Sequence, residues 1–422
     1  MSVTTPSGDS YKTDASGQNH IFALSCLTFL FFIWGFITCL NDILVPHLKN
    51  VFDLTYAQAS LVQLCFFGAY FIVSVPAGML VRRVGYQRGM VSGLVIAAIG
   101  CLMFYPAASM QIYGLFLAAL FVLASGITIL QVSANPYVTI LGRPETAASR
   151  LTWTQAFNSV GTTIAPQFGA LLILGAATAA AGTAEFKLQE ATAVQLPYLI
   201  LAGALALSAV VFSLLKLPQI ATAPEASAQT TSVQSVLKYR HLVLGAVGIF
   251  AYVGAEVSIG TYMVHFIGLP EIAGFTEQQA AQYLSFYWGG MLFGRFAGAF
   301  LMQFVAANKV LTFCGVMAAL LVVLAVVSTG HTAMWAILGV GLFNSIMFPT
   351  IFSLGVASLG RLTSNGSGVL CAAIVGGAIL PYIQGQLADT IGLQLSFIVP
   401  VFCYVYICYY GLVGSKIKQP QV

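Results

Sequence analysis

Charged residues are scarce in this chain. Only 7% of its 422 residues are Asp, Glu, Lys or Arg, and 59% are hydrophobic. Soluble domains carry roughly 25% charged residues, so a soluble surface of ordinary composition is excluded. The composition predicts a polytopic membrane protein whose apolar side chains face a lipid bilayer.

Patterns typical of enzymes and metal sites are also missing. All eight cysteines lie inside apolar segments without CxxC spacing, so we expect buried packing thiols rather than disulfides or metal ligands. The sequence shows no Ser–His–acid set, no cluster of metal ligands and no nucleotide-binding loop. We therefore expect neither an enzyme nor a cofactor. The net charge of +4 comes from scattered loop residues, which gives no reason to expect a nucleic-acid partner.

Residues 1–20 lack the basic n-region and the cleavage site of a signal peptide. They are polar and rich in Ser, Thr and Gly, and they contain Asp9 and Asp14. We expect a disordered cytoplasmic tail over 1–20 and a second short tail over 416–422.

Twelve apolar segments follow, each near the roughly 20 residues that span a bilayer. They cover approximately 21–46, 57–81, 88–108, 112–140, 148–175, 196–216, 242–268, 279–304, 309–329, 333–359, 366–388 and 392–414. The longest polar break, 217–241, divides them into six and six. We expect an N-terminal six-helix domain (21–216), a cytoplasmic linker (217–241) and a C-terminal six-helix domain (242–415).

The loop charges predict the orientation of the chain. With both termini in the cytoplasm, thirteen Lys and Arg residues lie inside, whereas only Lys49 and Lys187 lie outside and Arg295 falls within a segment. Such a bias is typical of cytoplasmic loops. We therefore expect a multi-pass protein of the cell (inner) membrane with both termini in the cytoplasm.

The two halves repeat short motifs in the same order. Leu141-Gly-Arg143 ends the fourth segment as Leu359-Gly-Arg361 ends the tenth, and Ala77-Gly78 in the second matches Ala297-Gly298 in the eighth. A Gly and Pro pair in the fifth recurs in the eleventh, and all offsets fall between 215 and 221 residues. Units with an even number of helices give parallel repeats. The predicted fold class is an all-α membrane protein with twelve transmembrane helices in two parallel six-helix repeats.

This 6+6 arrangement resembles the major facilitator superfamily, in which the substrate lies between the halves near the bilayer midplane. The stretch Pro76–Gly89 resembles the superfamily's loop between helices two and three, a glycine and basic cluster. Val81 and Arg82 stand where Asp is common in that loop. This departure puts the usual charge-pair latch in doubt.

An acid ends the first apolar segment. Asp42 costs about 2.5–3.5 kcal/mol at a membrane centre, and Pro46 deprives the Asp42 carbonyl of its helical partner if the helix continues. Trp34, Thr38 and Asp42 recur every four residues and share one helix face. Asp42 is either a helix-end acid at the headgroup boundary or a cation or proton site lining an aqueous cavity. We favour the second interpretation.

Few other polar residues lie within the apolar segments. Gln131 and Asn135 share one helix face, as do Gln155 and Asn158. Glu256 lies at the middle of the seventh segment, where an ionisable group needs a partner or water. The remaining candidates are Tyr283, Tyr287 and Asn344.

Two prolines accompany these residues. Pro136 frees the carbonyl of Val132 on the preceding turn, and Pro349 follows Asn344 and Ser345 in the tenth segment. In an alternative interpretation the amides join helices by hydrogen bonds, the aromatic residues are core or lipid-facing, and Arg295 is a structural latch. As a set, however, amides outnumber charges. Amides donate and accept as sugar hydroxyls do, and aromatic faces suit the C–H face of a pyranose, so a neutral polyol is the best match.

Four stretches resemble the fucose permease and glucose/galactose transporter family of the major facilitator superfamily, and the likeness covers roughly 20–414. They are Leu40–Pro46, Leu130–Gly142, Gln155–Ser159 and Phe348–Gly355. The resemblance implies cation-coupled sugar import with Asp42 as the coupling acid. Gln131 stands where the fucose branch has a second acid, and Glu256 stands where that branch has an amide. Both features resemble the glucose/galactose branch, some of whose members are sodium-coupled.

We therefore predict a symporter for a neutral hexose such as glucose or galactose, working as a monomer with Na⁺ or H⁺. Asp42 would hold the ion, a possible Na⁺ site, with Asn41 and Thr38. The predicted sugar-binding residues are Gln131, Asn135, Gln155, Asn158, Glu256, Tyr283, Tyr287 and Asn344. The alternatives are an uncoupled sugar facilitator or sensor, a transporter of fucose or mannose, and an exporter of lipids or drugs.

Overall fold

The computed structural model describes residues 17–52, 56–169, 194–218 and 233–417. Within these ranges the side chains of 17–20, 39–52, 56–60, 166–169 and 233–234 are not described. The described backbone is helical and contains no strand. The predicted tails at 1–16 and 418–422, and most of the predicted linker, lie outside the described residues.

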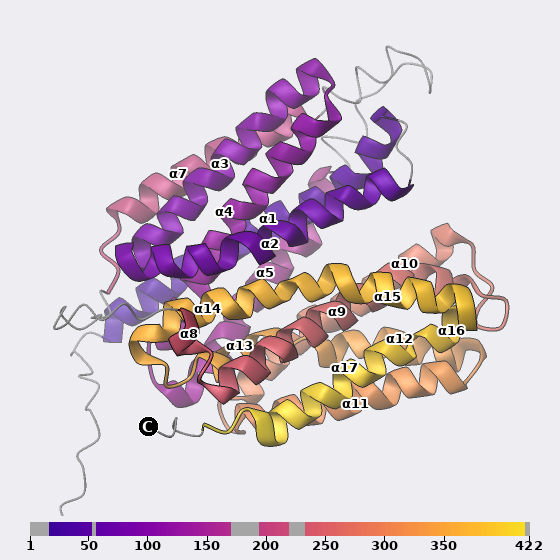
Figure 1. The fold of residues 1–422 in the computed structure, drawn as a ribbon. Coiled ribbons are helices and arrows are strands. Elements are labelled where there is room, and N and C mark those ends of the chain that lie inside the picture. Colours follow the sequence, from indigo (N-terminus) through magenta and orange to yellow (C-terminus); the bar gives the residue numbers. More distant parts are fainter. Residues whose placement is uncertain (1–16, 53–55, 170–193, 219–232, 418–422) are drawn as a thin grey trace, which may run out of the picture.

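Six long helices form the first half of the bundle. They are α1 (Gly17–Phe52), α2 (Tyr56–Val84), α3 (Tyr86–Met110), α4 (Tyr113–Ile140), α5 (Ala147–Gly169) and α7 (Gln195–Leu214). A short turn, α8 (Val233–Val236), precedes the second half. Figure 1 shows the helices of the first half lying beside those of the second half.

The second half also crosses the bundle six times, although three of its helices are broken. The unbroken helices are α9 (Arg240–Gly268), α10 (Glu277–Leu301) and α11 (Ala307–Val327). The broken ones are α12 (Gly330–Asn344) with α13 (Met347–Val356), α14 (Thr363–Ala372) with η4 (Ala373–Val375) and α15 (Gly376–Ile391), and α16 (Leu393–Ser396) with α17 (Ile398–Tyr409) and η5 (Tyr410–Gly414).

The described helices account for the twelve predicted membrane crossings. Ten helical stretches are long and apolar enough to span a membrane by length and composition. The other two are α5 and α10, which carry many of the polar residues discussed below. Large apolar side chains cover the outside of the bundle, with Leu214 77% and Phe402 69% exposed. Lipid rather than water suits such a surface.

The contacts between the halves follow the predicted duplication. Since the second segment matches the eighth and the fifth matches the eleventh, α2 corresponds to α10 and α5 to α14. Helix α2 packs against α14, and α10 packs against α5. Exchanging the two repeats turns the contact of α2 with α14 into the contact of α10 with α5. Two parallel repeats related by a pseudo-twofold axis produce such a matched pair of contacts.

The halves are held together at the end of the bundle where α2 ends and α14 begins, which we call the closed end. A Cβ at Gly78 would lie 2.7 Å from the Ser364 carbonyl oxygen, and one at Gly368 would lie 2.6 Å from the Ser74 carbonyl oxygen. Only residues without a side chain allow backbones to approach so closely. Helices α2 and α14 therefore meet backbone to backbone at this end.

A proline-freed carbonyl supplies a further link at the closed end. The Ser367 hydroxyl of α14 donates a hydrogen bond to the Val132 carbonyl, at 2.9 Å. Val132 is the residue whose carbonyl Pro136 was predicted to free. On α5, Ser149 Oγ donates to the Ala299 carbonyl of α10 at 2.6 Å. No ion pair joins the two halves among the described side chains.

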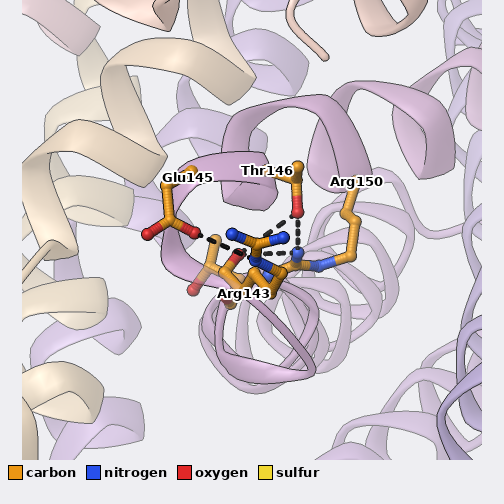
Figure 2. Close-up of polar contacts among 5 residues, drawn as sticks. Arg143, Glu145, Thr146 and Arg150 are labelled. Carbon is orange, nitrogen blue, oxygen red and sulfur yellow. Dashed lines mark hydrogen bonds and ion pairs between the residues drawn. The ribbon is translucent and has the colours of Figure 1, made fainter. Parts of the chain in front are cut away.

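Arg150 ties the end of α4 to the start of α5 (Figure 2). Its guanidinium donates to the carbonyls of Val138 (3.3 Å), Thr139 (2.8 Å) and Arg143 (2.8 Å), and to Thr146 Oγ1. The last carbonyls of a helix have no partner within that helix, so the guanidinium both satisfies them and matches the negative end of the helix dipole. Arg150 thereby fixes α4 relative to α5.

Arg150→Gln is expected to destabilise the protein by about 2 kcal/mol, because hydrogen bonds to charged groups are worth roughly 1.5–3 kcal/mol. The measurement is the unfolding temperature of the purified protein in detergent. Arg143→Gln is the matched control, since its side chain is 83% exposed and pairs only with the exposed Glu145, an interaction worth about 0–1 kcal/mol. Equal losses in both variants would contradict this role of Arg150.

Candidate functional site

A cavity of about 470 Å³ lies between the two halves. Its walls come from α1, α2, α4 and α5 of the first half and from α9, α10, α13 and η4 of the second half. Sites for small molecules typically occupy about 300–1,000 Å³. The cavity therefore has a size typical of a small-molecule site, and it lies between the halves, where the resemblance to the superfamily implies that a substrate binds.

Helices α1 and α5 form one wall. Thr38 lines the cavity together with Trp34, one turn earlier on α1, and Gln155 and Asn158 line it from α5. The two helices meet very closely, since a Cβ at Gly35 would collide with the Asn158 carbonyl. Asn158 Nδ2 donates to the Phe31 carbonyl at 2.9 Å. This bond holds the Asn158 amide in place while its oxygen remains available as an acceptor.

Gln131 of α4 lines the cavity and is 6% exposed. Its Oε1 has no hydrogen-bond partner among the described residues. Asn135, one turn further along α4, is fully buried, does not line the cavity, and leaves both amide atoms without a described partner. The predicted Gln131 and Asn135 pair is therefore split between the cavity wall and the interior.

Glu256 of α9 lines the opposite wall, with Tyr252 one turn before it. Trp288 of α10 lines the same side and presents an indole ring that is 44% exposed. Glu256 lies close enough to Arg295 for their charges to interact, yet no ion pair joins the two side chains. The carboxylate thus faces a polar cavity, as a mid-membrane acid requires.

Arg295 of α10 connects the second half to the first. Its guanidinium donates to the Gln155 carbonyl at 3.1 Å and to the Ser159 hydroxyl, both on α5. Its Nε also donates to the Ser345 carbonyl at 3.3 Å, which Pro349 leaves without a helical partner. Arg295 is therefore both a cavity residue and a link between the halves, whereas the sequence analysis named it only as a structural latch.

Besides Asn135, three more predicted sugar-binding residues lie outside the cavity lining. Tyr283 stacks on Phe275, with ring centroids 5.2 Å apart, and packs against Trp335. Tyr287 is fully buried behind Trp288 and accepts a hydrogen bond from Asn344 Nδ2 at 2.8 Å. Tyr287 and Asn344 therefore bond each other within the second half, while Asn344 Oδ1 has no partner among the described residues. This placement differs from the prediction because helix spacing alone does not tell which face turns toward the other half.

Asp42 and Asn41 lie in the part of α1 whose side chains are not described. Helix α1 itself continues to Phe52, so the helix does run through Asp42 and Pro46, as the argument about the freed carbonyl requires. Position 42 follows Thr38 by one turn on the same helix face. Thr38 Oγ1 donates to the carbonyls of Trp34 (3.1 Å) and Gly35 (3.0 Å) of its own helix.

The sequence analysis did not identify the residues of α2 that form one wall of the cavity. Helix α2 contributes Gln63, Phe66, Phe67 and Tyr70. These residues recur at i, i+3, i+4 and i+7, which places them on one helix face. Three aromatic residues beside a glutamine on a single face is the signal that could have identified this wall.

The lining is polar but nearly balanced in charge. Among the described side chains it holds one acid, Glu256, and one base, Arg295, together with three Gln, one Asn and several aromatic rings. No group of three or more metal-ligating side chains occurs in the described residues. Such a surface suits a neutral molecule with many hydroxyl groups better than an ion or a lipid.

The sequence profile of the Major Facilitator Superfamily matches residues 24–380. The chain belongs to this superfamily. It is 58% identical over 417 residues to a protein named glucose/galactose transporter from Brucella abortus, covering 99% of this chain and 100% of that protein. It is 33% identical over 431 residues to the L-fucose-proton symporter of Escherichia coli, covering 98% of each chain.

A solved structure supports the same assignment. The crystal structure of the superfamily transporter FucP in the outward conformation superimposes with a TM-score of 0.88 at 33% identity, covering 94% of this chain and 100% of that one. The predicted family resemblance, the twelve-helix fold with two repeats, and the expectation of a membrane transporter rather than an enzyme are all confirmed.

Proposed function

We propose that this superfamily member is a secondary transporter that imports a neutral hexose, such as glucose or galactose, together with Na⁺ or H⁺. The observation that carries the proposal is the cavity between the halves, which is lined by amides, aromatic rings and, among the described side chains, one acid and one base. The proposal includes a functional monomer that needs no cofactor.

The relatives support both parts of this proposal. The protein with 58% identity is named for glucose and galactose, and the relative with 33% identity is named as a proton symporter of a sugar. We further propose residence in the inner membrane with both termini in the cytoplasm, following the distribution of loop charges. In that orientation the closed end of the bundle faces the cytoplasm.

Hexose hydroxyls would find donors and acceptors on both halves. Gln131, Gln155 and Asn158 offer amides from the first half, and Glu256 offers a carboxylate from the second. The Trp288 ring provides a flat face for sugar C–H groups. A sugar that bonds both halves draws them together, and it drives alternating access by preferring the occluded form to the open forms.

The ion would bind near position 42. Asp42 supplies the charge in this proposal, with Asn41 and Thr38 as neutral oxygen ligands. Hard cations prefer such oxygens, and Gln131 removes the second acid that a proton relay across α1 and α4 would use. We therefore favour Na⁺, while a single carboxylate in a cavity can also carry a proton.

Counterflow in proteoliposomes tests the proposed function. Vesicles loaded with glucose or galactose should take up labelled hexose, and fucose, mannose and an amino acid serve as the panel. A sodium gradient at fixed pH should drive accumulation above the outside concentration, and choline should abolish it. Accumulation without sodium that collapses with a protonophore would assign the proton instead, and equilibration without accumulation would leave an uncoupled facilitator.

The cavity amides should determine affinity. Gln155→Ala, Asn158→Ala and Glu256→Gln are each expected to weaken hexose binding about tenfold, because an unpaired buried partner costs roughly 1–3 kcal/mol. Binding is measured calorimetrically on purified protein. Tyr283→Phe is the control, since Tyr283 lies outside the cavity and should bind normally. Lower folding yield with unchanged affinity would instead indicate that the amides only join helices.

A further inference from the structure

Polar side chains without partners are buried between the cavity and the closed end. Three helices of the first half each place one there, and Ser74 on α2, Asn135 on α4 and Thr152 on α5 are all 0% exposed. The hydroxyl oxygens of Ser74 and Thr152 and both amide atoms of Asn135 have no hydrogen-bond partner among the described residues. Buried polar atoms are almost always hydrogen-bonded. We call these three side chains the polar layer.

Each side chain of the polar layer lies one helix turn from a residue that lines the cavity, always on the side of the closed end. Those lining residues are, in the order of the helices, Tyr70, Gln131 and Gln155. Residues three or four positions apart share a helix face. The cavity wall therefore continues directly into the polar layer, which lies about 5 Å further toward the closed end, the length of three or four residues of α-helix.

The polar layer faces the second half of the chain. On α2, the Ser74 carbonyl oxygen would lie 2.6 Å from a Cβ at Gly368 of α14. On α4, Asn135 lies three residues beyond Val132, whose carbonyl accepts the hydrogen bond from α14. On α5, Thr152 shares a helix face with the residue three positions before it, which bonds α10. The second half thus seals the layer, and separation of the halves at this end would expose it.

The second half adds a polar atom of the same kind. Asn365 of α14 is 4% exposed, and its Oδ1 has no hydrogen-bond partner in the described part of the chain. A Cβ at Gly78, one turn beyond Ser74 on α2, would lie 3.3 Å from the Asn365 Cα. Amides and hydroxyls of both halves therefore lie around the closed interface. None of these four side chains is charged, so their chemistry matches that of the cavity amides.

The polar layer is unfavourable only while the closed end stays closed. A buried polar atom without a partner has lost its hydrogen bonds to water and gained none in return. Separation of the halves at this end would return the layer to polar surroundings and make it the wall of an open passage. Side chains with a purely structural role would instead be bonded in the closed form. The layer thus fits a role in the open form.

We propose that the polar layer, together with Asn365, is a second binding subsite for the transported hexose, which forms when the closed end opens. The inference rests on the proposed hexose transport. A hexose that leaves Gln131 and Gln155 moves about 5 Å to meet the Asn135 amide and the Thr152 hydroxyl. Amides and hydroxyls donate to and accept from sugar hydroxyls. Because the two subsites share one wall, the sugar exchanges its partners one by one.

Half-saturation of counterflow, measured from each face in right-side-out and inside-out vesicles, tests this subsite with the hexose that the native chain transports. Asn135→Leu and Thr152→Val replace the unpartnered atoms by apolar groups of similar size. Each should raise the half-saturating concentration about tenfold at the face of the closed end, the loss of one or two hydrogen bonds. At the other face the concentration should stay within about twofold of the native value. Unchanged values at both faces would contradict the subsite.

Monodeoxy analogues of the hexose, added as competitors, separate a lost contact from a shifted conformational equilibrium. A variant that only favours the closed form weakens every sugar equally at this face. A lost contact spares the analogue that lacks the hydroxyl bound by Asn135, so at least one analogue should compete equally well in Asn135→Leu and in the native chain. Equal loss for every analogue, or equal loss at both faces, would overturn the subsite.

Gln384→Leu and Ser258→Ala are the matched controls. Both native side chains are 0% exposed and carry polar atoms without a described partner, but they lie on α15 and α9 within the second half and do not line the cavity. Neither control should change half-saturation at either face. An effect of Gln384→Leu equal to that of Asn135→Leu would reduce the result to the loss of any buried amide and overturn the subsite.

The unfolding temperature in detergent guards against misfolding. Asn135→Leu and Thr152→Val should match or exceed the native value, because neither removes a hydrogen bond of the closed form. A clear fall in both would show that the layer is bonded in the closed form, contrary to the proposal. A native chain without hexose counterflow would contradict the proposed function and the subsite with it, whereas native counterflow with unaltered variants contradicts the subsite alone.

Discussion

Asp42→Asn should abolish the accumulation of hexose against its gradient while exchange of labelled for unlabelled hexose continues. The substitution removes the charge that a sodium ion needs and the group that a proton would occupy, without changing the size of the side chain. Coupling requires the ion and the sugar to favour the same occluded form. Without the ion, sugar alone can still move the halves, so downhill exchange persists.

The measurement compares accumulation and counterflow in the same proteoliposomes. The ratio of inside to outside hexose should fall to one in Asp42→Asn, while the counterflow rate stays within a few-fold of the native rate. Asp42→Glu, which keeps the carboxylate, is the matched control and should retain some accumulation. Normal accumulation by Asp42→Asn would show that another residue couples transport, and Glu256 would be the next candidate because it is the described acid in the cavity.

Periodicity and composition were sufficient to predict the helices and the halves. The spacing of Gln155 and Asn158 placed both on the cavity wall, and Pro136 identified a carbonyl that the other half contacts through Ser367. These predictions hold because they depend on local geometry. A spacing of three or four residues defines a helix face, and a proline removes one N–H, wherever the helix packs.

The rotation of each helix about its axis could not be predicted in the same way. Asn135 shares the Gln131 face but lies one turn further on, where α4 is buried, and Tyr287 bonds Asn344 of its own half and does not line the cavity. Both outcomes depend on which neighbours a helix has, and that is information from the tertiary structure. The α2 wall was missed because aromatic residues in an apolar segment are also typical of lipid-facing surfaces.

Arg295→Gln should open the closed end. In the structure its guanidinium holds α5 through the Gln155 carbonyl and the Ser159 hydroxyl. Losing even one hydrogen bond from a charged donor costs about 1.5–3 kcal/mol, which multiplies the population of the opened form by roughly ten- to a hundredfold. Hexose binding to the closed form should weaken in proportion, since the native shape of the cavity depends on the same contact.

A cysteine at position 149 reports this opening. Ser149 is 6% exposed and bonds the Ala299 carbonyl across the interface between the halves, so Ser149→Cys should react slowly with a polar maleimide in the native background. The same cysteine should react about ten times faster or more when combined with Arg295→Gln. The chain without Ser149→Cys gives the background from the native cysteines.

The labelling rates of further Arg295 variants show whether Arg295 holds the two halves together through its hydrogen bonds or acts only through its charge in the cavity. Arg295→Lys keeps the charge opposite Glu256 but cannot reproduce the forked donors that reach Gln155, Ser159 and the Ser345 carbonyl together. If geometry matters, this variant should label nearly as fast as Arg295→Gln. If only the charge near Glu256 matters, Arg295→Lys should label at the native rate and Glu256→Gln should restore protection to Arg295→Gln. Native labelling rates in both arginine variants would show that the helix contacts of α2 with α14 hold this end closed without Arg295.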